Sequence, residues 1–167
     1  ELKPSVSGQG TYGISLSGAV GTAGLVENIW MENLNVINWG TSGIYSRDEV
    51  FNVTCHHVAV KGCTGIGVDI GTAATGCSQW TFDDCFLSST AGVYAVEADC
   101  NDLRFMGGTI AGNAVSANGV YVIAGYGGFY GTHIEGYAAS TGTGFLWKGV
   151  SGWNSFATIF SWKYGAK

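Results

Sequence analysis

Proline and charged residues are both scarce in this chain. Pro4 is the one proline in 167 residues, and Asp, Glu, Lys and Arg together make up 11%, against about 25% in ordinary globular domains. Seven basic residues face twelve acids, which gives a net charge of −5 and a pI near 4.9. Because nucleic-acid binding needs a basic surface, this balance argues against a nucleic-acid partner.

Long apolar runs and a secretion leader are also missing. Uninterrupted apolar stretches fall far short of the ~18 residues that would span a membrane, so we expect no membrane insertion. No basic-then-apolar signal peptide opens the chain, which starts at Glu1 rather than Met. We expect a fragment of a longer protein, with one domain over 1–167 divided into an entry segment, 1–12, and stacked coils, 13–167.

The cysteine pattern is equally uninformative about chemistry. Five cysteines with no CxxC pair predict neither a disulfide framework nor a zinc site, and we expect no cofactor and no metal. Cys55 and Cys85 fall at apolar positions of the repeat described next, whereas Cys63, Cys77 and Cys100 are expected in loops.

What the chain has in abundance is glycine, 28 residues, and an internal repeat. An eight-residue pattern that is apolar or small at its first, third, sixth and eighth positions begins at Ile29, Val53, Trp80, Leu103, Phe129 and Ser155. A glycine-led strand precedes each copy, starting at Gly13, Gly43, Gly67, Gly92, Gly119 and Gly144. A period of about 25 residues is typical of solenoids, whose repeats span roughly 20 to 50 residues.

Period-two alternation within both patterns predicts strands rather than helices. Each coil then has three strands, and about six coils stack into three parallel sheets around one apolar column. Inward positions of the glycine-led strands are Ile14, Ile44, Val68, Val93, Val120 and Phe145. Those of the eight-residue pattern include Ile29, Met31, Leu34, Val36, Val53, Val58, Val60, Trp80, Phe82, Leu87, Leu103, Phe105 and Ile110.

This coil resembles the right-handed parallel β-helix of the pectin-lyase-like superfamily, which includes pectate lyases, polygalacturonases and phage tailspikes. Among these, the small-polar richness and the segment Gly131-Thr132-His133-Ile134-Glu135-Gly136 look most like a bacteriophage tailspike or tail fibre. The resemblance implies a parallel homotrimer in the virion tail, folded in the host cytoplasm. The polygalacturonase pattern is not satisfied, because no Asn-Thr-Asp, Gly-His-Gly or Arg-Ile-Lys accompanies Asp83-Asp84, and the calcium-binding aspartates of pectate lyases are not recognisable.

The outward column of the glycine-led strands suggests a glycan-binding track. We expect Tyr45, Tyr94 and Tyr121 to present aromatic faces and hydroxyls at coil spacing. Nearby acids supply candidate pairs for glycoside hydrolysis: Asp48, Glu49, Asp69, Glu97 and Asp99. Glu97 is the chosen acid, because apolar Val96 and Ala98 flank it, and Asp69, one coil below, is the chosen partner.

A second acid pair, Asp83-Asp84, falls at the corner between the second and third strands. His56-His57 occupies the same corner one coil below, so a His–Asp surface pair is one interpretation. Polar corner residues more often hydrogen-bond to the backbone and to adjacent coils, which makes Asp83 and Asp84 alternates only.

Outward aromatic residues in the second strand, Trp30, Tyr130 and Phe156, favour a contact with other chains. Two functions remain open. The chain is either a phage spike body that attaches to a bacterial capsule or lipopolysaccharide, with or without depolymerase activity, or a cellular endo-acting hydrolase or lyase of the pectin-lyase type.

Overall fold

A computed structural model describes residues 10–17, 26–71, 77–90, 93–113, 117–136 and 142–148, and the backbone of 154–161. Every regular element in these ranges is a β-strand, and no helix there is long and apolar enough to cross a membrane. The strands are β1 (Tyr12–Ser17), β2 (Val26–Glu32), β3 (Asn35–Ile37), β4 (Ser42–Arg47), β5 (Val50–His56), β6 (Ala59–Lys61), β7 (Val68–Ile70), β8 (Cys77–Asp83), β9 (Phe86–Ser89), β10 (Tyr94–Met106), β11 (Thr109–Gly112), β12 (Asn118–Ala124), β13 (Gly127–Gly136), β14 (Phe145–Trp147) and β15 (Asn154–Ser161).

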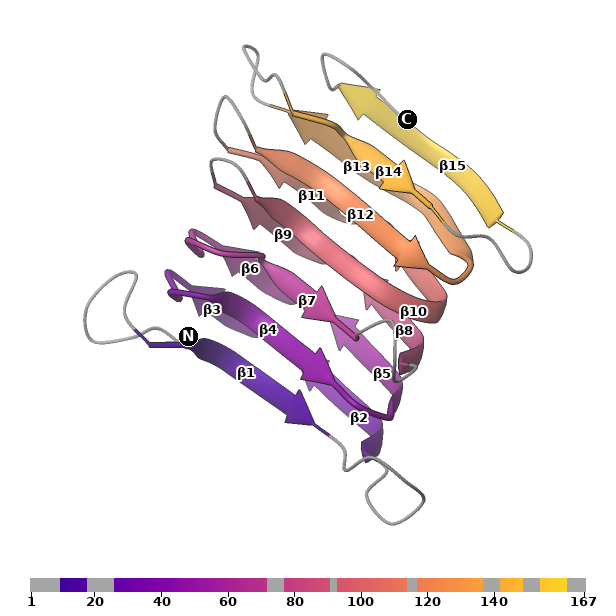
Figure 1. The fold of residues 1–167 in the computed structure, drawn as a ribbon. Coiled ribbons are helices and arrows are strands. Elements are labelled where there is room, and N and C mark those ends of the chain that lie inside the picture. The colour runs from indigo at the N-terminus through magenta and orange to yellow at the C-terminus, as the bar shows by residue number, and fades with distance from the viewer. Residues whose placement is uncertain are drawn as a thin grey trace.

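All recorded strand pairings are parallel, and they form three ladders. Ladder 1 is β1-β4-β7-β10-β12-β14, ladder 2 is β2-β5-β8-β10-β13-β15, and ladder 3 is β3-β6-β9-β11-β13-β15. Figure 1 shows the strands rising in tiers from β1 to β15. The fold is therefore the all-β parallel solenoid that the repeat predicts.

The number of turns is smaller than expected. The solenoid has about four turns rather than the six or so expected. The six repeats of the sequence are called the first to sixth coils in chain order, and each contributes one strand to ladder 1. Strands β1, β2 and β3 lie at one end of their ladders and β14 and β15 at the other, so these end strands each have a neighbour on one side.

The apolar column lies where the alternation predicts it. Eleven of the thirteen residues expected inward from the eight-residue pattern are buried, and Ile29 and Leu34 pack partly buried against them. Inside the column, Phe105 stacks on Phe82 and Phe129 with ring centroids 5.3 and 4.9 Å apart. Each such pair contributes about 0.5–1.5 kcal/mol beyond the burial of its area, so the aromatic stack ties successive coils together.

All five cysteines are free and buried. Cys55 and Cys85 point inward as expected. The loop prediction is wrong for Cys77 and Cys100, which lie in β8 and β10 and pair across adjacent coils. Burial raises the pKa of these thiols, so they behave as small apolar side chains.

The corner between ladders 2 and 3 is a column of left-handed residues. Asn33, His57, Asp84 and Gly107 all have positive φ, between 48° and 66°. Their backbone N–H groups donate to the coil above, as from His57 to the Asp83 carbonyl at 3.0 Å. Asn, Asp and His tolerate this conformation better than other non-glycine residues, which explains the polar corner that the repeat shows.

The register differs from the prediction in three coils. In the fourth, Val96 rather than Val93 pairs with Val68 and Val120, so Val96 is buried and Val93 is only partly buried. In the fifth, the repeat begins at Gly127 rather than Phe129, because Leu103 pairs with Gly127 and Phe105 with Phe129.

The second shift rearranges the predicted outward columns. With the repeat starting at Phe129, Tyr130 would pair with Arg104 and Glu135 with Thr109. Instead Tyr130 pairs with Met106, and His133 pairs with Thr109. In the sixth coil the repeat begins at Asn154 rather than Ser155, because Asn154 pairs with Gly127, and Phe156 therefore pairs with Phe129 rather than with Tyr130 as expected. The predicted outward direction of Phe156 lies outside the described side chains.

Candidate functional site

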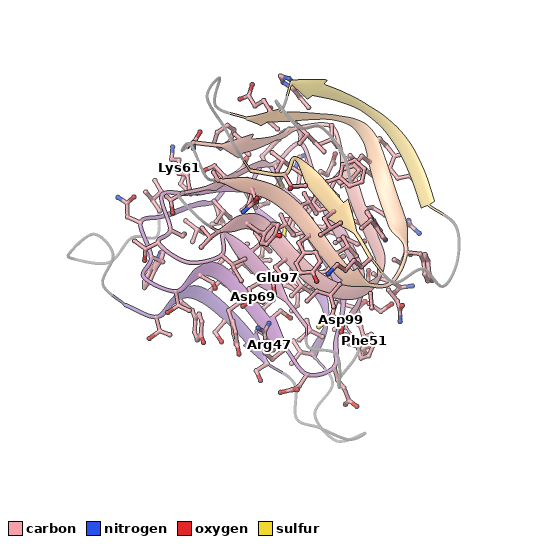
Figure 2. All side chains as sticks on the ribbon, turned by 45° about the horizontal axis from the view of Figure 1, so that its top comes forward. Arg47, Phe51, Lys61, Asp69, Glu97 and Asp99 are labelled. Carbon is pink, nitrogen blue, oxygen red and sulfur yellow. The ribbon has the colours of Figure 1, made fainter. Side chains whose placement is uncertain are left out.

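The outer face of ladder 1 gathers the polar and aromatic residues singled out by the sequence. Parallel pairing in register stacks Tyr45 on Ser15, Asp69 on Tyr45, Glu97 on Asp69 and Tyr121 on Glu97. Figure 2 shows Arg47, Asp69 and Glu97 close together on successive coils. The predicted acid and its predicted partner are thus direct neighbours across one coil step of about 4.8 Å.

Arg47 and Asp69 form a two-pronged ion pair. The guanidinium Nη1 lies 2.8 Å from Asp69 Oδ1, and Nη2 donates to Oδ2 at 2.9 Å. Nη1 also donates to the Ser46 carbonyl at 2.8 Å. Both side chains are largely enclosed, with 20% and 12% of their surfaces exposed. Such bidentate pairs are strong and fix both groups in one orientation.

An aromatic ring of its own strand, β4, packs against Arg47, and a second ring from β1 in the coil below stacks on the first. The Arg47 guanidinium carbon lies 4.3 Å from the centre of the Tyr45 ring, and Tyr12 stacks on Tyr45 at 4.0 Å. Sequence reasoning used neither Arg47 nor Tyr12 as a site residue. The sequence could have indicated Arg47, because Arg47 lies two residues after Tyr45 in the same strand and its side chain therefore points to the same face of the sheet.

Glu97 is the acid whose environment favours the protonated form. Burial raises its pKa, the neighbouring charge of Asp69 raises it further, and Arg47 opposes the shift. No hydrogen bond or ion pair joins Glu97 to another residue in the part of the chain described. The flanking Val96 and Ala98 are not the cause expected from the sequence, since both point into the core on the opposite face.

The tyrosines are arranged differently from the expected single column. Tyr94 pairs with Asn118, three residues before the position of Glu97, yet its ring lies 5.2 Å from that of Tyr121. Burial and the charge of Glu97 raise the pKa of Tyr94. Lys148 Nζ lies 5.2 Å from the Tyr121 ring, on the far side of the track from Arg47.

We name this surface the ladder 1 site and define it by Tyr45, Arg47, Asp69, Tyr94, Glu97, Tyr121 and Lys148. It combines aromatic faces, a fixed ion pair and one half-buried carboxyl.

The alternate acids lie around this site rather than in it. Asp48 and Glu49 connect β4 to β5, both with positive φ, and one buried Glu49 oxygen has no hydrogen-bond partner within the described residues. The glycine-led pattern that starts at Gly92 ends before Glu97 and so predicts a loop at Glu97 and Asp99, but both residues lie in the continuous strand β10. Asp99 pairs with Ala124 after a bulge, close to where β10 passes from ladder 1 to ladder 2.

Asp83 and Asp84 belong to the corner between ladders 2 and 3, where they meet the two histidines. His57 Nε2 lies 3.2 Å from Asp84 Oδ2, and His56 Nε2 lies 3.7 Å from Asp83 Oδ2. The two imidazoles stack at 3.8 Å. The corner is therefore a ladder of His–acid contacts between coils, as one sequence interpretation held.

This corner extends to the first coil through Glu32. His56 Nδ1 lies 3.3 Å from Glu32 Oε1, and the indole of Trp30 donates to Oε2 at 3.3 Å. These hydrogen bonds lower the pKa of Glu32. Trp30 is 62% exposed, the largest value among the exposed large apolar residues, which also include Phe86, Met106 and Tyr130.

Metal ligation has no support in the described residues, where no group of three or more His, Cys, Asp or Glu side chains is arranged to hold an ion. A scan against protein-family models, and searches of curated proteins and of solved structures, found no match. The β-helix fold is consistent with a β-helix superfamily, and the finer resemblance to pectin-lyase-like proteins and tailspikes rests on the sequence pattern alone.

Proposed function

We propose that this solenoid is the body of a phage tailspike or tail fibre and that its ladder 1 site binds a bacterial surface polysaccharide. The observation that carries the proposal is the row of Tyr45, Asp69, Glu97 and Tyr121 on successive coils, with Arg47 and Tyr94 beside it.

The geometry supports a sugar ligand for two reasons. Tyrosine rings offer apolar faces to the C–H groups of sugar rings, and their hydroxyls, with the carboxyl groups, offer hydrogen bonds to sugar hydroxyls. The Arg47–Asp69 pair and the stacked Tyr12 and Tyr45 rings also keep the surface in one arrangement before a ligand arrives. Pre-organisation lowers the entropy cost of binding.

Binding is tested with purified bacterial capsule and lipopolysaccharide in a titration calorimeter. We expect Tyr121→Ala to weaken binding at least about tenfold, because it removes one ring of the track. Phe86→Ala is the matched control, since Phe86 is an exposed aromatic residue on ladder 3, away from both the ladder 1 site and the proposed chain contact. Equal loss in both variants, or no loss in either, would contradict this placement.

A depolymerase activity is the second candidate, favoured by the adjacency of Glu97 and Asp69. In this reaction Glu97 gives its proton to the glycosidic oxygen as the bond from that oxygen to the anomeric carbon breaks. Asp69 either takes a proton from the attacking water or attacks the anomeric carbon itself, and the net change is the addition of one water. The raised pKa of Glu97 suits the acid role.

The activity test measures the length of host polysaccharide after incubation with wild type, Glu97→Gln and Asp69→Asn. We expect wild type to shorten the chains and both variants to lose at least about a hundredfold in rate. Asp83→Asn, at the distant corner, serves as the control and keeps its rate. Wild type that binds without cleaving would leave the attachment role and remove the enzymatic one.

Assembly and location follow from the same proposal. A parallel homotrimer in the virion tail would bury the outward Trp30 and Tyr130 and leave ladder 1 open to the glycan. The exposed aromatic residues on ladder 2 support such a contact.

A further inference from the structure

The charges of the ladder 1 site are already balanced in a way that limits which glycans can bind. Arg47, the cation at its centre, directs both terminal guanidinium nitrogens, Nη1 and Nη2, at Asp69 and lies against the Tyr45 ring. An anionic ligand would have to displace the Asp69 carboxylate from these contacts. Removing one partner of an enclosed ion pair costs far more than an exposed pair contributes, so Arg47 is not free to bind a sugar carboxylate.

The other central group, Glu97, repels anions once the pH lies above its raised pKa and the carboxyl is ionised. Glu97 stands one coil above Asp69, and no described residue pairs with its carboxyl group. A uronic acid lying along the track would place a third carboxylate beside these two. Like charges brought together in a partly enclosed site weaken binding.

The two cations of the site disfavour cationic glycans. Lys148 already lies over the Tyr121 ring and Arg47 over the Tyr45 ring, so the two aromatic faces that would attract an ammonium group each have a cation. An amino sugar would repel both. Counting Arg47, Lys148, Asp69 and Glu97, the ionised site carries two charges of each sign.

We infer that the ladder 1 site takes an uncharged glycan, built from neutral hexoses, deoxyhexoses or N-acetylated sugars, and excludes uronic-acid polymers. This inference rests on the proposed function. It also favours hydrolysis over lyase chemistry at the site. In a lyase reaction a base removes the proton next to the uronate carboxylate, a carbon–carbon double bond forms and the glycosidic oxygen departs. That path needs a cation to neutralise the uronate, and the central cation here is bound to Asp69.

Matched polymers test the inference. A panel of bacterial capsules and O-chains would be titrated into the full chain, each uronate polymer both native and after reduction of its carboxylates to alcohols. Chitosan oligosaccharides would be compared with their N-acetylated forms. We expect the neutral member of each pair to bind at least about tenfold tighter, with affinity that changes little between low and high salt, since uncharged ligands are not screened.

Two variants test whether the Glu97 carboxyl group causes the preference for uncharged polymers. Glu97→Gln removes the unpaired carboxyl and should narrow the gap between native and carboxyl-reduced polymers, whereas Asp83→Asn, at the far corner, should leave it unchanged. A native uronate polymer that binds tighter than its reduced form, or a cleavage product with the ultraviolet absorbance of an unsaturated uronate, would overturn the inference while the glycan-binding role stands. If no polymer in the panel binds, the proposed function fails and takes the inference with it.

Discussion

At the scale of single residues, the ion pair between Arg47 and Asp69 is the most constrained feature of the surface. It joins two coils, and both partners are mostly enclosed. Exposed ion pairs contribute about 0.2–1 kcal/mol, whereas breaking a buried pair costs about 3–5 kcal/mol. With 12–20% of each side chain exposed, we expect the free-energy cost of breaking this pair to lie between those two ranges.

Asp69→Asn should therefore lower the free energy of unfolding by about 1–3 kcal/mol, because Arg47 is left enclosed without its counter-charge. Arg47→Met should lower the free energy of unfolding by a similar amount, because Asp69 is then left enclosed without its counter-charge. The double variant should lose less than the sum of the two single losses, as contacting residues do. Urea denaturation of the four proteins measures the difference. Losses that simply add would show that the pair contributes no coupling energy.

The raised pKa of Glu97 gives a stability prediction with a definite sign. Because the folded chain holds this proton more tightly than the unfolded chain, stability falls as pH rises from the ordinary value of 4.5 through the folded pKa. Glu97→Gln removes that loss. The variant should be more stable than wild type at neutral pH, and the advantage should disappear below pH 4.5. Thermal melts across this range measure it, and an advantage that persists in acid would point to packing instead.

At the scale of strands and corners, period-two alternation identified the three ladders and placed eleven of the thirteen residues expected inward from the eight-residue pattern in the core. It failed where two registers fit equally well. Val93-Tyr94-Ala95 and Val96-Glu97-Ala98 both have an apolar, polar, small order, three residues apart, and a shift by an odd number exchanges the two faces. Hydrogen bonding to β7 selects the second register and puts Glu97 beside Asp69.

The error in the fifth coil had milder consequences. Starting the repeat at Phe129 rather than Gly127 is a shift of two, which keeps each residue on its face and changes only its neighbour in the next coil. Phe129 and Ile134 are accordingly buried as expected. For Tyr130 and Glu135, the prediction was wrong only about which residue of the adjacent coil each one pairs with. The contacts of Arg47 could not be obtained from alternation, because they depend on side-chain geometry across coils.

Two glycines at the corner between ladders 2 and 3 provide a matched test of the turn. Gly108 and Gly131 have nearly equal φ values of 67° and 72°, so alanine at either costs about 1–2 kcal/mol of backbone strain. Only at Gly108 would the added Cβ collide with backbone, 2.2 Å from the Cys85 carbonyl oxygen, while nothing lies within 4 Å at Gly131. Gly108→Ala should therefore destabilise the fold clearly more than Gly131→Ala in chemical denaturation. Equal effects would mean that the corner has room to relax.

At the scale of the whole molecule, the solenoid presents two outer surfaces of different character. Ladder 1 carries the balanced ion pair and the tyrosines, and ladder 2 carries Trp30 and Tyr130. A rod of stacked coils places these surfaces on different strands of every turn, so a ligand and another chain can bind without competing for the same residues.

The assembly prediction follows from this separation. If ladder 2 forms the proposed trimer contact, Trp30→Glu should raise the dissociation constant of the trimer by at least about tenfold, because a large aromatic residue at an interface is replaced by a charge that needs water. Ser15→Glu, an exposed change on ladder 1, is the control and should leave the trimer intact. Sedimentation over a range of concentrations measures the oligomer, and circular dichroism confirms that each variant keeps its β-structure. A wild-type chain that stays monomeric at every concentration would rule out the trimer. Dissociation by Ser15→Glu but not by Trp30→Glu would move the contact to ladder 1, where it would cover the glycan site.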